Sequence, residues 1–455
     1  MNLIAENESD ARSLKVTFII AAVGLLFGIS GGMVGVSRYV QLTIMMLLVF
    51  GVYLKPHWGM YLVAVALPFV LNQSIFLLGA FLFLCYVLHC LHRGEICLYP
   101  FIQEPALVFF VLLLAASTIT SLNPSASIRD AVILAGSLGF FYLIIHLFKR
   151  RQQLHAWLML TVLVGFLLSM YGMYQFFVGV PVESAWVDAD LHPWLTSRVY
   201  SVFDNPNVFA GYLTMLAPVS LGLLWSAKDL KKKIFLGAIF FSVVVNSLLT
   251  FSRSGWMGLM AAVLVFLWLA GRRGLIVLLL LSLIIGIVSS ERLFERVMSI
   301  FDPGETSHSY RLIVWQESGT MLREHWLTGI GMGHLVYRQI YPTYMLTRGK
   351  RPYHSHNTFL QYAIEFGLVG LGLFLWFLFR TFKRGLQILR RTEDRFIFHA
   401  TTGSLAAVAG LLVQGLGDHV VYMPKITVLF WLNIGVIYLC SRIIDTSQPS
   451  ELPSA

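Results

Sequence analysis

The chain has 455 residues, of which 57% are hydrophobic and only 12% are charged, and its formal net charge is +10. A soluble domain carries about 25% charged residues, so these values exclude a water-soluble fold and place most of the chain in lipid. The mean hydropathy of +0.74 agrees with this interpretation. The positive charge could indicate nucleic-acid binding, but its distribution along the chain argues against that partner.

Long apolar segments predict the secondary structure. A transmembrane helix needs ~20 mostly apolar residues, and backbone polar groups must pair internally in hydrocarbon, which favours helices. We expect an all-α integral membrane protein that forms a single membrane domain over 1–455. Some segments are short and the region 57–91 can be divided in more than one way, so about 12–14 transmembrane helices are expected. The candidate segments lie near 15–36, 38–54, 57–72, 75–91, 104–122, 127–148, 154–179, 207–227, 234–252, 255–271, 275–290, 357–380, 396–417 and 425–444.

The N-terminal segment differs from a cleaved signal peptide. The acidic residues Glu6, Glu8 and Asp10 occupy the region that is basic in a signal peptide. The apolar run that follows is also longer than a cleaved segment requires. We expect it to remain as the first helix, with both termini in the cytoplasm.

Four basic clusters each adjoin an apolar segment. Lys and Arg are enriched in loops on the cytoplasmic side of a membrane, and with both termini inside all four clusters fall on that face. They therefore indicate topology and not a nucleic-acid partner. The clusters lie at 149–151, 228–233, 272–273 and 380–395.

We expect the four cysteines to contribute only apolar packing. Cys85, Cys90, Cys97 and Cys440 fall toward the inner face in this topology. Their spacing does not match a zinc site, and no pair is placed for a disulfide in an oxidising compartment.

Two of the expected outer loops are long. The first spans 180–206 and the second spans 291–356, whereas most other loops are a few residues long. Loops of this length are usually functional or disordered. Both are rich in Trp, Tyr, Pro and Gly, so we expect ordered loops, the second of which forms a large cap.

The second loop is expected to contain a helix. Leu312, Trp315, Leu322 and Trp326 recur at roughly helical spacing. The glycines of the following GIGMG sequence, at 329–333, could form a phosphate loop, but no strand precedes them. Helix termination and tight packing are the better interpretation.

Arginine and histidine side chains converge on the expected outer face. Arg198 ends the first long loop, Arg253 lies in a tight turn, and Arg311 begins the cap helix. His354 and His356 lie where the second loop re-enters the membrane. Lipid headgroups could pair with a single snorkelling arginine, but several cations at one cavity favour an anion site. A guanidinium group binds phosphate bidentately, which suits a lipid-linked phosphate.

Histidine can take and return a proton near neutral pH. A base that activates a sugar hydroxyl, beside arginines that stabilise a departing pyrophosphate, is sufficient for glycosyl transfer. Either histidine could instead be an interfacial residue at a helix start, where Asn357 could be the cap. The outer acidic residues form no tight pair, so no metal and no other cofactor is expected; they are Asp188, Asp190, Asp204 and Asp302. Aromatic residues could stack on sugars, although core and interface positions are their commoner use; they are Trp186, Trp194, Tyr200 and Trp315.

Five sequence elements, in order, resemble the O-antigen ligase and O-antigen polymerase superfamily. HSHNTFLQYAIEFGLVG resembles its histidine signature, and RVYSVFDNPNVFAGYL resembles its Arg and Asn-Pro-Asn element. The other three elements are TFSRSGWMGL, YRLIVWQESGTMLREHWLTGIGMG and LVQGLGDHVVYMPKITVLFW. The resemblance extends over about 195–435.

The resemblance implies a GT-C-like helical bundle with a large periplasmic loop in the bacterial inner membrane. Its members are metal-independent, inverting glycosyltransferases that take a glycan from undecaprenyl pyrophosphate. The acceptor is lipid A-core, another lipid-linked repeat unit or a protein hydroxyl, and the residues alone do not decide among these.

The resemblance also implies roles for individual residues. The essential histidine corresponds to His356, with His354 as an additional candidate base. Arg198 and Arg253 correspond to the pyrophosphate-binding arginines, and Arg311 is a further candidate contact. The candidate contacts to glycan or acceptor are Tyr200, Asn205, Asn207 and Asp418.

A transporter of a lipid-linked glycan or a small anion is the alternative. Residues 182–207 also resemble a cyanobacterial branch linked to inorganic-carbon uptake, but members of that branch lack the histidine pair that this sequence keeps. Transporters often carry ionisable residues deep in their helices. Here Glu365 and His399 are the main examples, so polar chemistry at the outer interface favours an enzyme.

Overall fold

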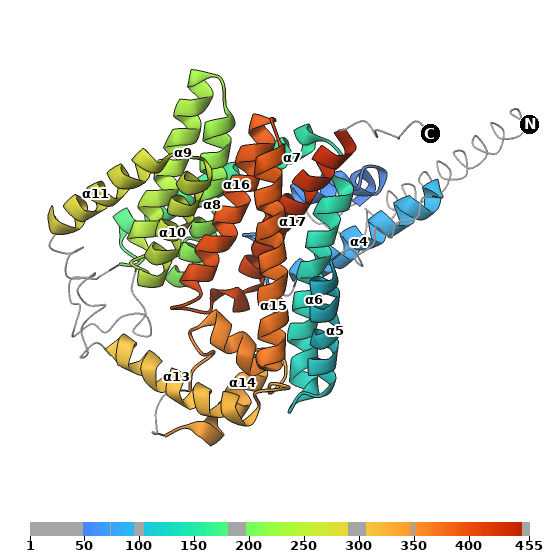
Figure 1. The fold of residues 1–455 in the computed structure, drawn as a ribbon, viewed down its shortest axis with the longest axis vertical. Coiled ribbons are helices and arrows are strands. Elements are labelled where there is room, and N and C mark those ends of the chain that lie inside the picture. Colours follow the sequence, from blue (N-terminus) through green and yellow to red (C-terminus); the bar gives the residue numbers. More distant parts are fainter. Residues whose placement is uncertain are drawn as a thin grey trace, which may run out of the picture. The chain divides into compact units, whose positions relative to one another are not determined.

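The computed structural model describes residues 49–72, 74–94, 104–180, 197–289, 306–346 and 351–447. These residues form helices and connecting loops, and no strand occurs among them. Eight of the helices are long and apolar enough to cross a membrane. The expectation of an all-α integral membrane protein is confirmed (Figure 1).

The helices follow one another through short connections. In chain order they are α3 (His57–Ala66), α4 (Ser74–Arg93), α5 (Pro105–Ile119), α6 (Pro124–Leu147), α7 (Arg151–Val178), α8 (Pro206–Ser226), α9 (Leu230–Leu249), α10 (Arg253–Leu269), α11 (Arg273–Ser289), α13 (Thr306–Glu324), α14 (His334–Ile340), the 3₁₀ helix η3 (Tyr341–Tyr344), α15 (Thr358–Arg391), α16 (Arg395–Gln414), η4 (Val420–Tyr422) and α17 (Pro424–Ser447).

The eight candidate spans coincide with predicted segments. They are α4, α6, α7, α8, α9, α15, α16 and α17. The segments near 104–122, 255–271 and 275–290 correspond to α5, α10 and α11, which have 15, 17 and 17 residues. The segment 57–72 contains the 10-residue α3. The segment 15–36 and most of 38–54 lie outside the described residues, which, with the four shorter helices α3, α5, α10 and α11, accounts for the difference between the eight spans and the 12–14 helices expected.

The chain divides into two compact units, Met1–Trp58 and Gly59–Ala455. In the described part of the first unit, residues 49–58, Lys55 Nζ lies 5.4 Å from the centre of the Trp58 ring. The second unit contains the helices that position the histidines and arginines.

Small residues allow α8, α10 and α16 to pack closely. A Cβ atom on Gly258 of α10 would lie 2.8 Å from the carbonyl oxygen of Gly410 on α16. A Cβ atom on Gly403 of α16 would lie 2.8 Å from the carbonyl oxygen of Pro218 on α8. Close approach of backbones through small residues is typical of helix association in membranes. These three helices therefore form a closely packed support for the loops at their ends.

The helix α15 is kinked at Gly367. This residue has a φ of 70°, a conformation that glycine adopts without steric cost. The N–H of Leu368 donates to the carbonyl oxygen of Trp326, and the N–H of Ile330 donates to the carbonyl oxygen of Ile364. The backbone around the kink thus forms hydrogen bonds with the segment that follows α13. The glycines of GIGMG serve tight packing there, as predicted, because a Cβ atom on Gly331 would overlap the Ser121 side chain.

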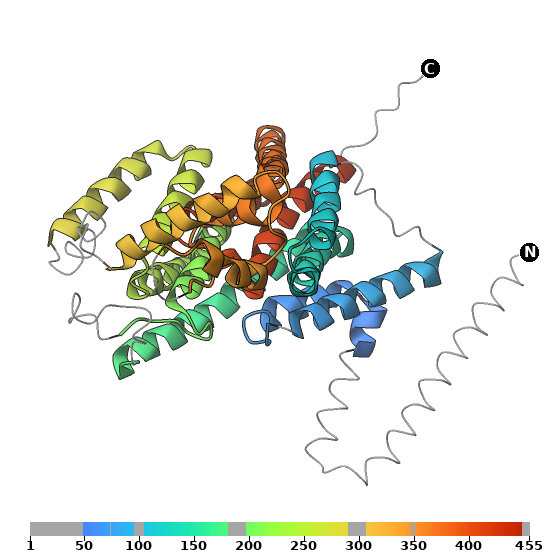
Figure 2. The same cartoon turned by 90° about the horizontal axis from the view of Figure 1, so that it is seen from below.

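The second long loop contains α13, α14 and η3, as expected of a loop with short helices. Figure 2 looks onto this end of the second unit and shows α13 lying across it. Of the apolar residues whose spacing predicted this helix, Leu312 is exposed, Leu322 is partly buried against the core, and Trp326 lies beyond the end of α13. The buried positions are Val314, Glu317, Ser318 and Met321. The helix packs through Val314 and Met321 against Tyr337, Tyr341 and Ile364, and Glu317 accepts hydrogen bonds from Tyr341 and the N–H of Leu346.

The basic clusters lie at the helix ends remote from α13 and α14. Arg151, at the start of α7, lies 3.0 Å from Asp394 beside α16. Arg395 donates to the carbonyl oxygen of Trp225 at the end of α8. Figure 1 shows α13 and α14 together at the opposite end of these helices. This separation agrees with the charge pattern on which the expected topology rests.

The expectation that no cysteine forms a disulfide is wrong at one position. Cys85 and Cys440 are free and buried, whereas Cys90 is disulfide-bonded. Pairing requires only that two Cα atoms lie about 4.4–6.8 Å apart, so sequence spacing did not exclude it.

Candidate active site

The histidine pair lies in the loop that leads into α15. Asn357 is the N-cap of α15, and its side-chain oxygen accepts hydrogen bonds from the N–H groups of Phe359 and Leu360. His356 precedes it with a φ of 53°, a left-handed conformation that is uncommon outside glycine. The indole of Trp315 on α13 donates to the carbonyl oxygen of Ser355 at 2.9 Å. The helix α13 therefore holds the histidine loop, residues 354–356, close to the start of α15.

His356 pairs with Asp418, which follows α16. The distance from His356 Nδ1 to Asp418 Oδ1 is 3.1 Å. Burial opposes ionisation of Asp418, but the hydrogen bond from His356 and the positive charge of Arg311 hold its pKa well below its usual range. An ionised carboxylate only accepts hydrogen bonds, so Nδ1 of His356 is the donor. The other ring nitrogen, Nε2, is then free to accept a proton.

A chain of hydrogen bonds connects Asp418 to Arg198. The amide nitrogen of Asn207 donates to Asp418 Oδ2 at 2.7 Å, and its amide oxygen accepts from Arg198 Nη2 at 3.0 Å. Arg198 is 5% exposed and its Nε donates to the carbonyl oxygen of Thr250. These bonds orient the guanidinium beside the turn that leads to Arg253.

The Asn-Pro-Asn sequence has a distinct purpose at each position. The side chain of Asn205 caps α8 and accepts from the N–H groups of Asn207 and Val208. Pro206 is the first residue of the helix, where its missing N–H is not needed. The side chain of Asn207 is therefore available to bond both Arg198 and Asp418. The backbone carbonyl oxygen of Asn207 accepts a hydrogen bond from Gln414 of α16.

Arg253 and Arg311 come from two further elements. Arg253 is the first residue of α10, which Ser252 caps through the N–H of Gly255. Arg311 lies in the second turn of α13 and contributes positive charge at Asp418. Its neighbour Tyr310 places its ring 6.0 Å from the ring of His356. Arg198 and Arg311 are thus connected to the histidine loop through Asn207 and Asp418, and Arg253 lies three residues after Thr250, to which Arg198 bonds.

His354 is buried behind His356 among other rings. Its ring centre lies 4.5 Å from that of His356, 5.5 Å from that of His419 and 4.7 Å from that of Tyr422. Burial and the charge of His356 lower the pKa of His354 well below its usual value. Burial likewise lowers the pKa of His419 to about 3. Both rings are therefore neutral near pH 7.

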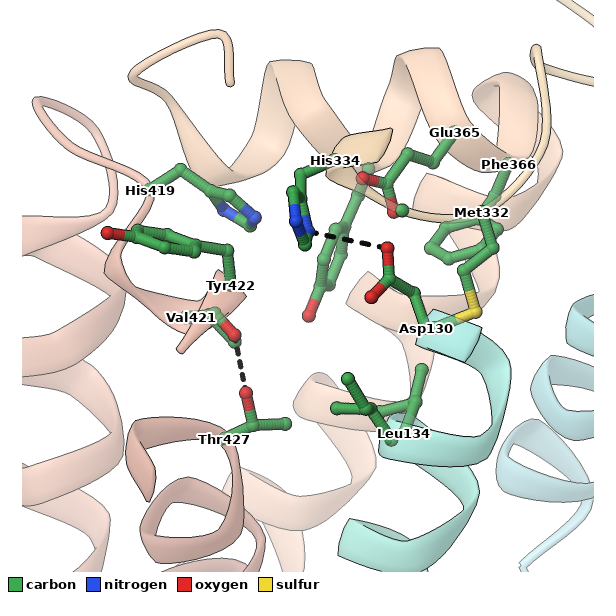
Figure 3. Close-up of a pocket in the computed structure, with 13 residues that line it drawn as sticks. Asp130, Leu134, Met332, His334, Glu365, Phe366, His419, Val421, Tyr422 and Thr427 are labelled. Atoms are coloured by element: carbon green, nitrogen blue, oxygen red, sulfur yellow. Dashed lines mark hydrogen bonds and ion pairs between the residues drawn. The ribbon is translucent and has the colours of Figure 1, made fainter. Parts of the chain in front are cut away.

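A cavity of about 50 Å³ lies beside these rings. Figure 3 shows His419 and Tyr422 on one side of it and Asp130, His334 and Glu365 on the other. His334 Nδ1 lies 3.3 Å from Asp130 Oδ2. Burial, followed by the charges of Arg129 and Arg338, lowers the pKa of His334 to about 4. A cavity of this size with several polar groups can hold ordered water.

The ligand atoms of His354, His356 and Asp418 lie within 4.8 Å of one another, which raises the question of a metal site. Nδ1 of His354 accepts a hydrogen bond from the N–H of His356. A neutral imidazole has one acceptor nitrogen, so Nε2 of His354 carries a proton and offers no lone pair to a metal. The hydrogen bonds favour proton transfer at this cluster over metal binding.

The structure brings together most of the predicted site residues. His354, His356, Asn207, Asp418, Arg198 and Arg311 belong to one connected group. Tyr200 and Asn205 lie in the loop before α8, where Gln175 accepts from the N–H of Tyr200. The predicted loop 180–206 is described only at 180 and 197–206, and the loop 291–356 only at 306–346 and 351–356. Five of the aromatic and acidic residues considered for these loops lie outside those parts, namely Trp186, Asp188, Asp190, Trp194 and Asp302.

Sequence reasoning missed four residues that surround the pair. His419 and Tyr422 lie one and four residues after Asp418 in the DHVVY sequence. Their proximity to this candidate residue could have identified them as further candidates. Asp130 and His334 come from α6 and α14, and only the folded chain brings them to the same cavity.

Comparison with known proteins supports one family. Residues 238–376, about a third of the chain, match a family model described as O-antigen ligase. The matched region contains Arg253, Arg311, His354 and His356, whereas Arg198, Asn207 and Asp418 lie outside it.

A curated relative agrees with this match. A protein of Rickettsia bellii (strain RML369-C) named "Putative polysaccharide ligase" is 28% identical over 116 residues. The alignment covers 22% of this chain and 28% of the relative. Together with the apolar helices, the two comparisons indicate a multi-pass membrane protein that is similar to the O-antigen ligase family and to a bacterial protein named as a polysaccharide ligase.

Proposed function

We propose that this chain, which the match at residues 238–376 assigns to the O-antigen ligase family, is a glycosyltransferase that uses an undecaprenyl-pyrophosphate-linked glycan as donor. It transfers the glycan to a hydroxyl group of an acceptor glycan during cell-surface polysaccharide assembly. The observation that carries this proposal is the pairing of His356 with the ionised Asp418. This pairing leaves a proton-accepting nitrogen beside a group of arginines.

His356 acts as the general base. Its Nε2 accepts the proton of the acceptor hydroxyl while that oxygen attacks the anomeric carbon of the donor sugar. The bond between the anomeric carbon and the pyrophosphate oxygen breaks, and undecaprenyl pyrophosphate leaves with the electron pair. A single displacement from the face opposite the leaving group inverts the anomeric centre. Asp418 stabilises the imidazolium that forms and keeps the ring in the required tautomer.

The arginines receive the pyrophosphate. Negative charge grows on the leaving oxygen, and guanidinium groups stabilise it bidentately. Arg253 and Arg311 are the contacts that we assign to the donor phosphates. Arg198 contributes its charge from a fixed position, since Thr250 and Asn207 already accept from its Nε and Nη2. The reaction as proposed uses no metal ion.

In this proposal, the end of the second unit that carries the histidine loop faces away from the cytoplasm. The support is the position of the basic clusters at the remote helix ends. In the bacterial inner membrane this orientation puts the site on the periplasmic side, with both termini in the cytoplasm.

Transport is the alternative function that the sequence suggests, but the described residues give it less support. Two of the buried ionisable groups within the helices have protein partners, since Gln361 donates to Glu365 and His334 lies beside Asp130, whereas Nδ1 of His399 is buried without one. Such partners stabilise a fixed structure and do not mark a path through the membrane.

A reconstitution experiment tests the proposal. The protein in liposomes is incubated with an undecaprenyl-pyrophosphate oligosaccharide and no other acceptor, and the lipid-linked products are separated on a gel. A ladder of longer glycans indicates a polymerase. If no ladder forms, lipid A-core and a candidate protein acceptor are added in turn. Failure to extend any of the three acceptors while the donor crosses the bilayer would contradict transfer and support transport.

A further inference from the structure

A second, larger cavity lies next to the histidine cluster. It has a volume of about 490 Å³, within the range of roughly 300–1,000 Å³ that is usual for ligand pockets. Its walls come from the starts of α4, α6 and α17, together with His334 and Tyr353. Both α4 and α6 are candidate membrane spans, so the cavity opens among helices that contact hydrocarbon.

One part of the cavity is apolar. Phe76 and Leu77 of α4 face Val132 and Ile133 of α6 across it. Leu77 and Val132 are exposed on the surface of these helices, as expected of side chains that contact lipid tails. This part of the cavity suits a hydrocarbon chain.

The other part is polar and carries one cation. Arg129 is exposed and, among the described residues, has no hydrogen-bond or ion-pair partner. The side-chain oxygen of Asn72 is buried without a hydrogen-bond partner. A guanidinium group at the edge of an apolar wall attracts a phosphate, and an unpaired amide oxygen can accept from a sugar hydroxyl.

The polar part is connected to His356 through a series of ring contacts. Tyr353 donates to or accepts from His334 Nε2 at 2.8 Å and stacks on that ring. The ring of Tyr422 lies 5.5 Å from that of Tyr353 and 4.7 Å from that of His354. His354 in turn lies beside His356. Asn207 of α8 and Arg198 of the loop before α8 approach Asp418 from another side, so the cavity and the donor arginines reach the pair through different residues.

We infer that this cavity binds the acceptor, and that the acceptor is a glycolipid with a phosphate between its hydrocarbon and its glycan. The phosphate pairs with Arg129, the hydrocarbon lies along Phe76, Leu77 and Val132, and the glycan passes Tyr353 and Tyr422 toward His356. A single arginine matches one phosphate of the acceptor, whereas three arginines serve the donor pyrophosphate. The inference rests on the proposed function and names the class of its second substrate.

Acceptor kinetics in proteoliposomes test this inference. The same oligosaccharide is offered either free or attached to a short polyprenyl phosphate, with donor in excess. We expect Arg129→Gln to raise KM for the lipid-phosphate acceptor about tenfold, because a charged hydrogen bond is lost. KM for the donor and the rate with the free oligosaccharide should not change. Arg323→Gln, at an exposed arginine of α13 outside the cavity, is the matched control.

A second pair of variants tests the apolar wall. Val132 is 54% exposed, so Val132→Trp fills the cavity without entering the core and should also raise KM for the lipid-phosphate acceptor. Leu167→Trp, on the exposed surface of α7, should leave that KM unchanged. An unchanged KM in both Arg129→Gln and Val132→Trp, or equal use of the free oligosaccharide by the wild type, would overturn the inference.

A photoaffinity measurement separates the inference from the proposed function. Farnesyl phosphate that carries a diazirine is expected to label residues 72–77 and 129–133 of the wild type more strongly than the matching farnesol probe, and Arg129→Gln should remove this preference. Equal labelling by both probes would overturn the inference even if transfer occurs. Displacement by phosphatidylglycerol as effective as that by the polyprenyl phosphate would identify a general lipid site, and would also overturn it. Absence of transfer to every acceptor would contradict the proposed function, whatever the labelling.

Discussion

At the residue scale, the backbone of His356 explains how its ring reaches Asp418. A left-handed conformation in a residue other than glycine costs about 1–2 kcal/mol, and it persists only where the surroundings enforce it. Here the N–H of His356 donates to His354 Nδ1, and Asn357 begins α15 immediately afterwards. Ser201, Asp204 and Phe251 have the same conformation in the segments around Arg198. Strained residues therefore gather where the sequence predicts chemistry.

Asp418→Asn tests the orientation of His356. The amide lacks the negative charge that stabilises the imidazolium and can itself donate to Nδ1, which would move the ring proton to Nε2. We expect kcat for transfer to fall about a hundredfold or more, with little change in KM for either substrate. Steady-state kinetics of the purified variant provide the check. A kcat within twofold of the wild type would remove Asp418 from the mechanism.

At the element scale, the kink in α15 joins the membrane helices to the cap. The carbonyl groups around Gly367 accept from or lie against the segment after α13, and α13 in turn holds Ser355 through Trp315. The sequence predicted a helix here correctly, but none of the four apolar residues that indicated it is fully buried, and α13 ends at Glu324, before GIGMG. The reason is that Glu317 and Ser318 are buried through hydrogen bonds to Tyr341 and Tyr337. A periodicity of apolar residues does not detect buried polar positions of this kind.

Gly367→Ala tests the kink. The new Cβ atom would lie 2.1 Å from the carbonyl oxygen of Leu327 at a positive φ, so we expect a destabilisation of at least about 1 kcal/mol and a lower melting temperature in detergent. Gly372→Ala, five residues later in the same helix, is the matched control because no atom lies within 4 Å of its added Cβ. The control should be neutral or slightly stabilising. Equal melting temperatures for the two variants would show that the kink does not require glycine.

At the scale of the whole molecule, the sequence predicted the membrane class and the arrangement of charge. Composition and apolar segments were sufficient for eight spans, since lipid imposes a simple length requirement. The hydrogen-bonded group of Arg198, Asn207, Asp418 and His356 could be anticipated only as separate elements. Its members are up to 220 positions apart, from Arg198 to Asp418, and a single sequence carries no signal for such contacts. The cavity that borders α4 and α6 was not predicted for the same reason.

Buried neutral histidines predict acid sensitivity of the whole fold. Burial lowers the pKa of His334 to about 4 and of His419 to about 3, whereas a histidine in the unfolded chain titrates near about 6.5. The unfolded chain therefore binds more protons, and stability falls as the pH drops below about 6.5, by about 1.4 kcal/mol per pH unit for each such histidine. We expect the melting temperature in detergent to be lower at pH 5 than at pH 7.5. His419→Gln should reduce this difference, and an equal difference in that variant would contradict the assignment.

The most direct test of the central claim is the rate of glycan transfer by reconstituted His356→Ala. His325→Ala is the matched control, because His325 lies in the cap and contacts Tyr344 instead of the histidine pair. We expect His356→Ala to insert and fold normally but to transfer glycan at least about a hundredfold more slowly, while His325→Ala retains the wild-type rate. Near-normal transfer by folded His356→Ala would contradict a catalytic base at this position and, with it, the mechanism proposed for this site.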